Sequence, residues 1–414
     1  MTGALLAVAL AAFLRAHPPS PDPATLAVPP ETDKLARELV RQLGDRDYDT
    51  REDATRQLRD LGRLALPALQ DGFDHSPSPE AAERCDQLLP RARALDIRAR
   101  VDCFAADAAG RYRHDLPGGA EFFAITGRTE PARKLFRTLL LSPNRGLLSG
   151  IGGPDDELAR AVVERRVELY PRSVVVGGAV QRTPPPSALD VIAVYFAECT
   201  LPEKAVVAAG AGAGGVAVTS PTVLLTQPAV RTALESDPLR EPMAAVVTRW
   251  CETRTEPRSV YLSMSAAATL KLPVAVTVAK KVLADKAATP LYKAQAACTV
   301  ARTGKPADAA LLAPLLADDT QAHPGMVVVV NGVQQKSPIQ VRDVALAMSL
   351  LLTGQEPTAY GLKSRYAGNA ASQETLKYSY FAYYFDDADG QADEARKAAV
   401  KKWNDWRAKN PEKK

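Results

Sequence analysis

The segment that most constrains the fold is 49–70, DTREDATRQLRDLGRLALPALQ, whose pattern predicts two short helices joined by a turn. Its apolar residues recur at the spacing that places them on one face of a helix: Ala54, Leu58 and Leu61. Gly62 follows as a residue that ends a helix, and Pro67 stands where a second helix can begin. A single helical hairpin cannot bury its own apolar face, so we expect further hairpins that pack against it.

Capping residues predict where helices begin. Asp49 can cap the first helix of the hairpin, with Glu52 three positions later as in a capping box. Pairs of a capping residue and a proline predict further helix starts: Ser78-Pro79, Ser220-Pro221, Asp237-Pro238 and Thr289-Pro290. We expect helices at residues 33–43, 79–89, 155–169, 187–198, 239–252, 258–270, 273–285 and 391–408. Pro90 is expected to kink or end the helix that contains Cys85.

Two downstream segments repeat the hairpin pattern. In the first, four residues match Arg51, Ala54, Leu58 and Gly62 in spacing, and a proline precedes the leucines of the second helix: Lys293, Ala296, Val300, Gly304 and Pro314. In the second, 341–354, the matching residues are Arg342, Ala345 and Leu352. These hairpins resemble HEAT repeats over about 47–90 and 289–353. The resemblance implies an all-α fold, an α-solenoid of HEAT-like helical hairpins, and it assigns no activity.

Residues 326–341 interrupt the helical pattern. Asn331-Gly332 is a strong signal for a two-residue hairpin turn, because both residues tolerate positive φ. We expect a β-hairpin with one strand at 327–330 and the other from Val333, inserted into the last repeat and packed on a neighbouring helix. The stretch 171–187 is open to two interpretations, a hinge loop or a strand at its valine-rich start.

The N-terminus predicts export. Residues 4–14 form an apolar run of 11 residues, too short to span a bilayer and of the length of a signal-peptide core. We therefore expect a signal peptide at 1–16 and a periplasmic or cell-envelope location; the alternative is a buried or frayed segment in a cytoplasmic protein. The predicted order continues with an extended Pro-rich tether, HEAT-like hairpins, a degenerate helical array and an aromatic-rich capping segment with a helix: 17–32, 33–115, 116–354 and 355–414.

The charge and cysteine composition of the chain limits the classes of partner and of covalent cross-link to expect. The chain has 52 Lys and Arg against 48 Asp and Glu, a net charge of +4 that makes nucleic acid an unlikely partner. The five cysteines are dispersed without a Cys-x-x-Cys pair, which favours buried thiols. Cys85 and Cys103 are the one pair close enough in sequence to indicate a disulfide, and their state stays open.

No motif predicts catalytic, cofactor-binding or metal-binding residues. Gly210, Gly212 and Gly215 match a dinucleotide-binding fingerprint, but β-branched residues and a proline follow where a helix is required, so we expect a flexible inter-helix loop. The four histidines lie too far from one another and from the cysteines to show metal-ligand spacing. The acidic cluster at 386–389 lacks the final glutamate of a calcium loop, which favours a helix-capping role.

A basic segment, 84–113, offers a candidate anion or partner surface. Its candidate residues are Arg91, Arg93, Arg98 and Arg100. Aspartates interleave with these arginines, which favours a solvated face with ion pairs over a binding patch for a polyanion.

Aromatic residues gather near the C-terminus, in 378–385, YSYFAYYF. Trp403 and Trp406 follow on the last predicted helix, on the same side as three alanines: Ala392, Ala395 and Ala399. Large rings can close the open end of a solenoid, and exposed rings can anchor a partner. Both interpretations of the two tryptophans stay open.

Together these patterns predict a monomeric, non-catalytic scaffold that binds a protein partner on a helical-repeat surface, without an integral membrane span. Two other classes remain: an enzyme whose site is assembled from several repeats, and a HEAT-like nucleic-acid-binding module.

Overall fold

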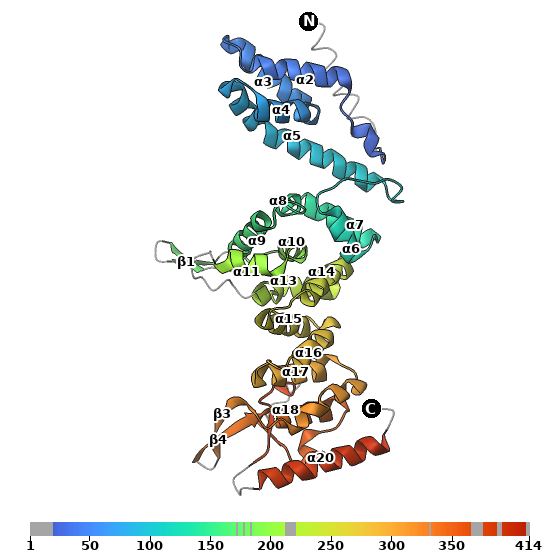
Figure 1. Ribbon diagram of the computed structural model, residues 1–414, viewed down its shortest axis with the longest axis vertical. Coiled ribbons are helices and arrows are strands. Elements are labelled where there is room, and N and C mark those ends of the chain that lie inside the picture. Colours follow the sequence, from blue (N-terminus) through green and yellow to red (C-terminus); the bar gives the residue numbers. More distant parts are fainter. Residues whose placement is uncertain are drawn as a thin grey trace. The chain divides into compact units, whose positions relative to one another are not determined.

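Figure 1 shows the computed structural model, which describes residues 20–410 apart from 171–172, 177–178, 183, 212–220, 331–332, 366–375 and 387–390. The described residues form 18 α-helices, five 3-10 helices and three two-stranded antiparallel sheets, so the chain is mainly helical, as predicted. It divides into two compact units, Met1–Ser149 and Gly150–Lys414.

Unit 1 consists of helices that follow one another with short connections. They are η1 (Pro23–Leu26), α2 (Pro30–Gln42), α3 (Tyr48–Leu61), η2 (Gly62–Ala65), α4 (Leu66–His75), α5 (Pro79–Ala106), α6 (Gly119–Thr126), α7 (Glu130–Leu140) and α8 (Arg145–Ser149). The predicted hairpin is formed by α3 and α4, with Gly62 at φ 58° as the C-cap of α3 and the first residue of η2. Ala54 and Leu58 are buried in one core with residues of α2, α4 and α5, so the hairpin covers its apolar face with neighbouring helices.

Three details of unit 1 differ from the predictions. Helix α3 is capped by Asp47 and not by Asp49, because Asp47 Oδ2 accepts the Thr50 N–H at 2.9 Å from an extended backbone position. Helix α5 continues through Pro90 to Ala106, since packing of residues on both sides of the proline outweighs one missing hydrogen bond. The described part of the Pro-rich segment, 20–32, is not extended throughout: it forms η1 and the start of α2.

Unit 2 contains helices, 3-10 turns and the three small sheets. They are α9 (Asp155–Leu169), β1 (Ser173–Val176), β2 (Ala179–Arg182), α10 (Ala188–Cys199), α11 (Glu203–Ala211), α12 (Pro221–Leu225), α13 (Pro228–Ser236), α14 (Arg240–Glu252), α15 (Pro257–Thr269), α16 (Val274–Ala284), α17 (Pro290–Thr303), η3 (Pro306–Leu311), η4 (Ala313–Ala317), β3 (Gln321–Val330), β4 (Val333–Gln340), α18 (Val341–Leu352), η5 (Pro357–Tyr360), β5 (Lys363–Ser364), β6 (Tyr383–Tyr384) and α20 (Ala392–Lys409).

Helices of unit 2 pack mainly on their neighbours in sequence. Helix α14 contacts α15, α15 contacts α16, α16 contacts α17, and α17 contacts α18 (Figure 1). The inserted β-hairpin is confirmed as β3 and β4, which pair antiparallel, with Val330 opposite Val333. Its first strand starts at Gln321, earlier than predicted, and it packs on α17. The predicted turn, 331–332, lies outside the described residues.

Local rules fail at three points in unit 2. The second helix of the repeat at 290–319 is a pair of 3-10 turns, η3 and η4, because Pro306 and Pro314 each start a new turn. Asp237-Pro238 does not start a helix: Asp237 Oδ1 accepts the Leu239 N–H at 2.7 Å, and α14 begins at Arg240. Gly210 lies in α11 and not in a loop, while 212–220 lies outside the described residues.

Candidate partner-binding surfaces

The candidate arginines of unit 1 lie along α5, among acidic residues of the same helix. Arg98 pairs with Asp102 at 3.4 Å and Arg100 with Asp96 at 2.7 Å, each one helical turn apart. Arg93 donates a hydrogen bond to Gln70 of α4, and Arg91 is exposed without a partner among the described residues. Helix α5 carries five arginines and five acidic residues, so it offers no net positive charge to a polyanion.

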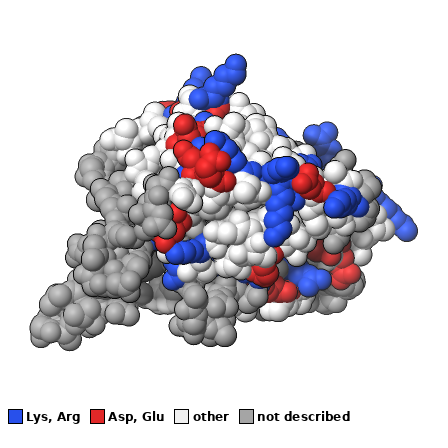
Figure 2. Space-filling model, turned by 90° about the horizontal axis from the view of Figure 1, so that it is seen from below, with Lys and Arg blue, Asp and Glu red and all other residues white. Residues whose placement is uncertain are grey.

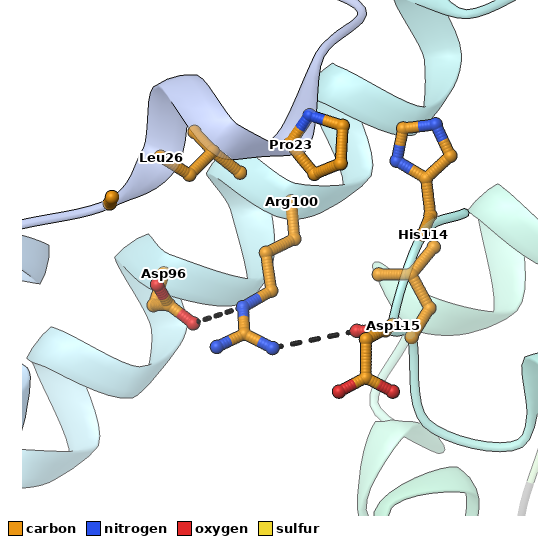
Figure 3. A pocket seen from close by; sticks show the side chains of 8 residues that line it. Pro23, Leu26, Asp96, Arg100, His114 and Asp115 are labelled. Carbon is orange, nitrogen blue, oxygen red and sulfur yellow. Dashed lines mark hydrogen bonds and ion pairs between the residues drawn. The ribbon is translucent and has the colours of Figure 1, made fainter. Parts of the chain in front are cut away.

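Arg100 lies in a pocket of about 290 Å³ at the C-terminal half of α5 (Figure 3). The apolar part of the wall comes from Pro23 and Leu26 of η1, from Ala27 after it and from Leu116. The polar part is Asp96 and Arg100 of α5 with His114 and Asp115 of the following loop. Arg100 Nη1 also donates to the backbone oxygen of Asp115 at 3.4 Å. The sequence predicted Arg100 as a surface residue but did not predict that the loop after α5 returns to it.

A buried carboxylate orients the histidine of this pocket. Asp107 is 2 % exposed and accepts hydrogen bonds from the N–H groups of Arg111 and Tyr112, at 2.9 and 3.0 Å, and from His114 Nε2 at 3.1 Å. Burial acts to raise the pKa of Asp107, but the two backbone donors and the imidazole outweigh it, so the pKa is lowered. The ring of Phe104 meets His114 edge to face, with centroids 5.4 Å apart.

Unit 2 contains a buried ionic cluster that the sequence did not predict. Glu198 of α10 pairs with Arg166 of α9 and, at 3.0 Å, with Arg254, and each of the three side chains is 3 % exposed. Trp250 Nε1 donates to the same carboxylate at 2.8 Å. The cluster ties α9, α10 and α14 together. The signal that could have revealed it is Glu198, an acidic residue near the end of the otherwise apolar helix ALDVIAVYFAEC, whose other acid, Asp190, caps the helix start.

The two candidate tryptophans have different environments. Trp403 is 0 % exposed, so it belongs to the core, and Trp406 is half-buried. Ala392 and Ala399 share the buried face, whereas Ala395 is exposed, contrary to the prediction that it lies with them. Helix α20 is held to α18 by Arg396, whose Nε and Nη2 donate to the two oxygens of Asp343 at 2.7 and 3.0 Å. Trp403 therefore fits the capping interpretation and cannot contact a partner.

The aromatic run contributes to a groove of about 200 Å³ in unit 2. Tyr378, Tyr380 and Phe381 line it together with Tyr261 of α15 and Arg302 of α17. Tyr380 and Phe381 meet edge to face, with centroids 5.0 Å apart. Arg302 is exposed and has no ion pair to any described residue, and none of the described residues that line the groove is acidic.

The remaining candidate features are the cysteines, possible metal ligands, membrane-spanning helices and the acidic cluster. All five cysteines are free, and burial raises the pKa of the Cys85 thiol to about 11, so Cys85 and Cys103 form no bridge here. In the described part of the chain, no group of three or more His, Cys, Asp or Glu side chains could hold a metal ion. Among described helices, none is both long and apolar enough to cross a membrane. Asp387 and Asp389 of the acidic cluster lie outside the described residues.

Comparison with protein families, with curated proteins and with solved structures gives no match to this chain in any of the three.

Proposed function

We propose that the chain is a non-catalytic, monomeric scaffold of HEAT-like helical hairpins that binds a protein partner. The observation that carries the proposal is the aromatic groove of unit 2. Tyrosine and arginine are the residues that most often anchor protein–protein contacts, and here three tyrosines and an arginine without an ion pair to described residues line one groove.

The packing of unit 2 supports the solenoid part of the proposal. In a stack of repeats each helical pair contacts its neighbours, and the surfaces between pairs stay open to partners. The succession from α14 to α18 has this pattern. The 3-10 turns η3 and η4 and the inserted hairpin make the last repeat irregular.

Charge disfavours a nucleic-acid-binding function. Figure 2 views the end of the chain where α20 lies, and over the described part of that face Lys and Arg alternate with Asp and Glu. Nucleic-acid binding needs a continuous basic surface. Helix α5, the most arginine-rich helix, is itself charge-balanced.

An enzyme is the other alternative, and the Asp107–His114 pair is its strongest support. A histidine held by a buried aspartate acts as a general base when a nucleophile lies within reach. The described residues that line the pocket beside His114 include no Ser, Thr, Cys, Lys or Tyr. The pair closes the loop after α5, which accounts for its geometry without a reaction.

The export prediction belongs to the same proposal. The apolar run at 4–14 lies outside the described residues, and its length supports a signal peptide and an envelope location. Fractionation of cells that express the chain with a C-terminal tag should place it in the periplasm or envelope. Recovery in the cytoplasm with residues 1–16 retained would contradict this part.

Affinity capture tests the scaffold function. The full chain, immobilised and mixed with an envelope extract, should retain a partner that is lost about tenfold when Tyr380→Ala or Arg302→Glu is introduced. Tyr112→Ala and Arg59→Glu are matched controls, because both side chains are exposed and lie in unit 1. Equal capture by all variants, or no retained protein, would refute the proposed groove.

A further inference from the structure

The pocket beside Arg100 has the charge of a site for cations and not for anions. Its described lining holds two carboxylates, Asp96 and Asp115, against one guanidinium, which leaves one net negative charge when His114 is neutral. Asp96 is engaged by Arg100 at 2.7 Å. The Asp115 carboxylate is exposed and forms no ion pair with a described residue.

His114 adds a hydrogen-bond acceptor on a largely buried side chain. Its side chain is 7 % exposed, and Nε2 is bound to Asp107. A neutral imidazole that donates Nε2–H to a carboxylate keeps Nδ1 as an acceptor. No described residue binds Nδ1, and Figure 3 shows the ring at the pocket wall with the Nδ1 side turned toward Pro23.

The polar groups and the apolar wall fit a ligand with two separated hydrogen-bond donors joined by an apolar segment. In Figure 3 the side chains of Asp115 and His114 point in opposite directions, so one ligand needs two separate donors to reach both. A lysine or arginine residue in a polypeptide has them: a cationic head and a backbone N–H, joined by an aliphatic stem. The stem matches Pro23 and Leu26, and the cavity of about 290 Å³ has room for one such side chain.

We propose that this pocket binds a lysine or arginine side chain of a partner polypeptide, with Asp115 facing the cation and His114 Nδ1 accepting a backbone N–H. Arg100 fixes the loop through the Asp115 backbone oxygen and is not itself the ligand-binding group. The inference rests on the proposed scaffold function only in that the ligand belongs to a protein. It involves unit 1 alone and not the aromatic groove.

Calorimetry with the full chain at low ionic strength tests the pocket. The probes are blocked tripeptides, Gly-Lys-Gly and its neutral analogue Gly-norleucine-Gly, and the lysine peptide should bind at least about tenfold more tightly. Asp115→Asn should remove this difference, while the matched control Asp60→Asn, an exposed aspartate of α3, should keep it. His114→Leu should weaken both peptides equally, since it removes the acceptor for the backbone.

Arg100→Gln gives the most discriminating result. If the pocket is a cation site, this substitution removes a repelling charge and tightens binding of the lysine peptide. If α5 instead presents a surface that binds anions, the substitution leaves the affinity for the lysine peptide unchanged and weakens binding of a Gly-Glu-Gly peptide. Preference for Gly-Glu-Gly, or equal binding of lysine and norleucine peptides by the wild-type chain, would overturn the inference. Because isolated peptides are used, these outcomes are independent of whether the aromatic groove captures a partner.

Discussion

At the scale of single residues, the most consequential side chain is Glu198, a carboxylate that faces two arginines inside unit 2. Charged groups taken out of water are tolerated only when they are paired and hydrogen-bonded. The Trp250 indole N–H completes the set of donors on this carboxylate. The cluster therefore fixes how three helices meet, although it adds little to stability compared with an apolar core.

Glu198→Gln should lower the free energy of unfolding by about 3–5 kcal/mol, because it leaves two buried guanidinium groups without a counter-charge. Urea unfolding at neutral pH measures the change. Glu164→Gln is the matched control, since Glu164 is exposed on α9, and it should change stability by less than about 0.5 kcal/mol. Similar losses for the two variants would show that the cluster is not fully buried.

The pH dependence of stability should report on Asp107. Its pKa is lowered in the folded chain, so its contribution is present above the unfolded value of about 3.9 and is lost as the pH falls through the folded pKa. Asp107→Asn should therefore flatten the acid side of the stability profile below about pH 4. Unfolding midpoints measured from neutral pH downward check this, with Asp60→Asn as a control that keeps the wild-type slope.

At the scale of elements, helix α4 packs so closely on α2 and α5 that one position requires glycine. A Cβ on Gly72 would lie 2.5 Å from Val40 Cγ1 and 2.9 Å from Cys85 Sγ. Both distances are shorter than van der Waals contact, so an added methyl group must push two helices apart. The hairpin found in the sequence thus depends on a close approach that the sequence pattern does not indicate.

Gly72→Ala should destabilise unit 1 by about 1–3 kcal/mol, although alanine favours a helix over glycine by about 1 kcal/mol. Gly146→Ala provides the comparison, because no atom lies within 4 Å of a Cβ at that position of α8. It should be neutral or stabilising by up to about 1 kcal/mol. Thermal unfolding of the two variants measures the difference, and stabilisation by Gly72→Ala would contradict the packing.

The sequence predicted these elements well where the signal was local. Capping by Ser78 and Thr289 is confirmed, because their hydroxyl oxygens accept the N–H groups of Ala81 and Tyr292. The predicted helix ranges are found within three residues at each end, except that the helix at 79–89 extends to Ala106. Predictions failed where packing decides: the alternative that a helix ends at Pro90 is wrong, because Pro90 lies within a continuous helix.

The candidate sites were harder to predict, because they join residues far apart in sequence. Glu198 lies 32 positions from Arg166 and 56 from Arg254, and the aromatic groove joins 261 to 381. No periodicity reports such contacts. The arginines and the aromatic run were found as compositional features. The charges that surround them, their burial and their neighbours follow only from the fold.

At the scale of the whole molecule, we propose that unit 2 is a stack of helical hairpins in which neighbours stabilise one another. In such a stack stability is roughly a sum of local and nearest-neighbour contributions. A defect in one hairpin should then loosen that hairpin and those beside it. A single cooperative core would spread the same defect over all of unit 2.

Hydrogen exchange of Val278→Ala tests this most directly. Val278 is 0 % exposed in the middle of α16, and its truncation should cost about 2 kcal/mol. A stack of hairpins predicts that amide protection falls in α15, α16 and α17, while α9 and α10 keep wild-type protection. An equal loss of protection in α9 and α10 would contradict it.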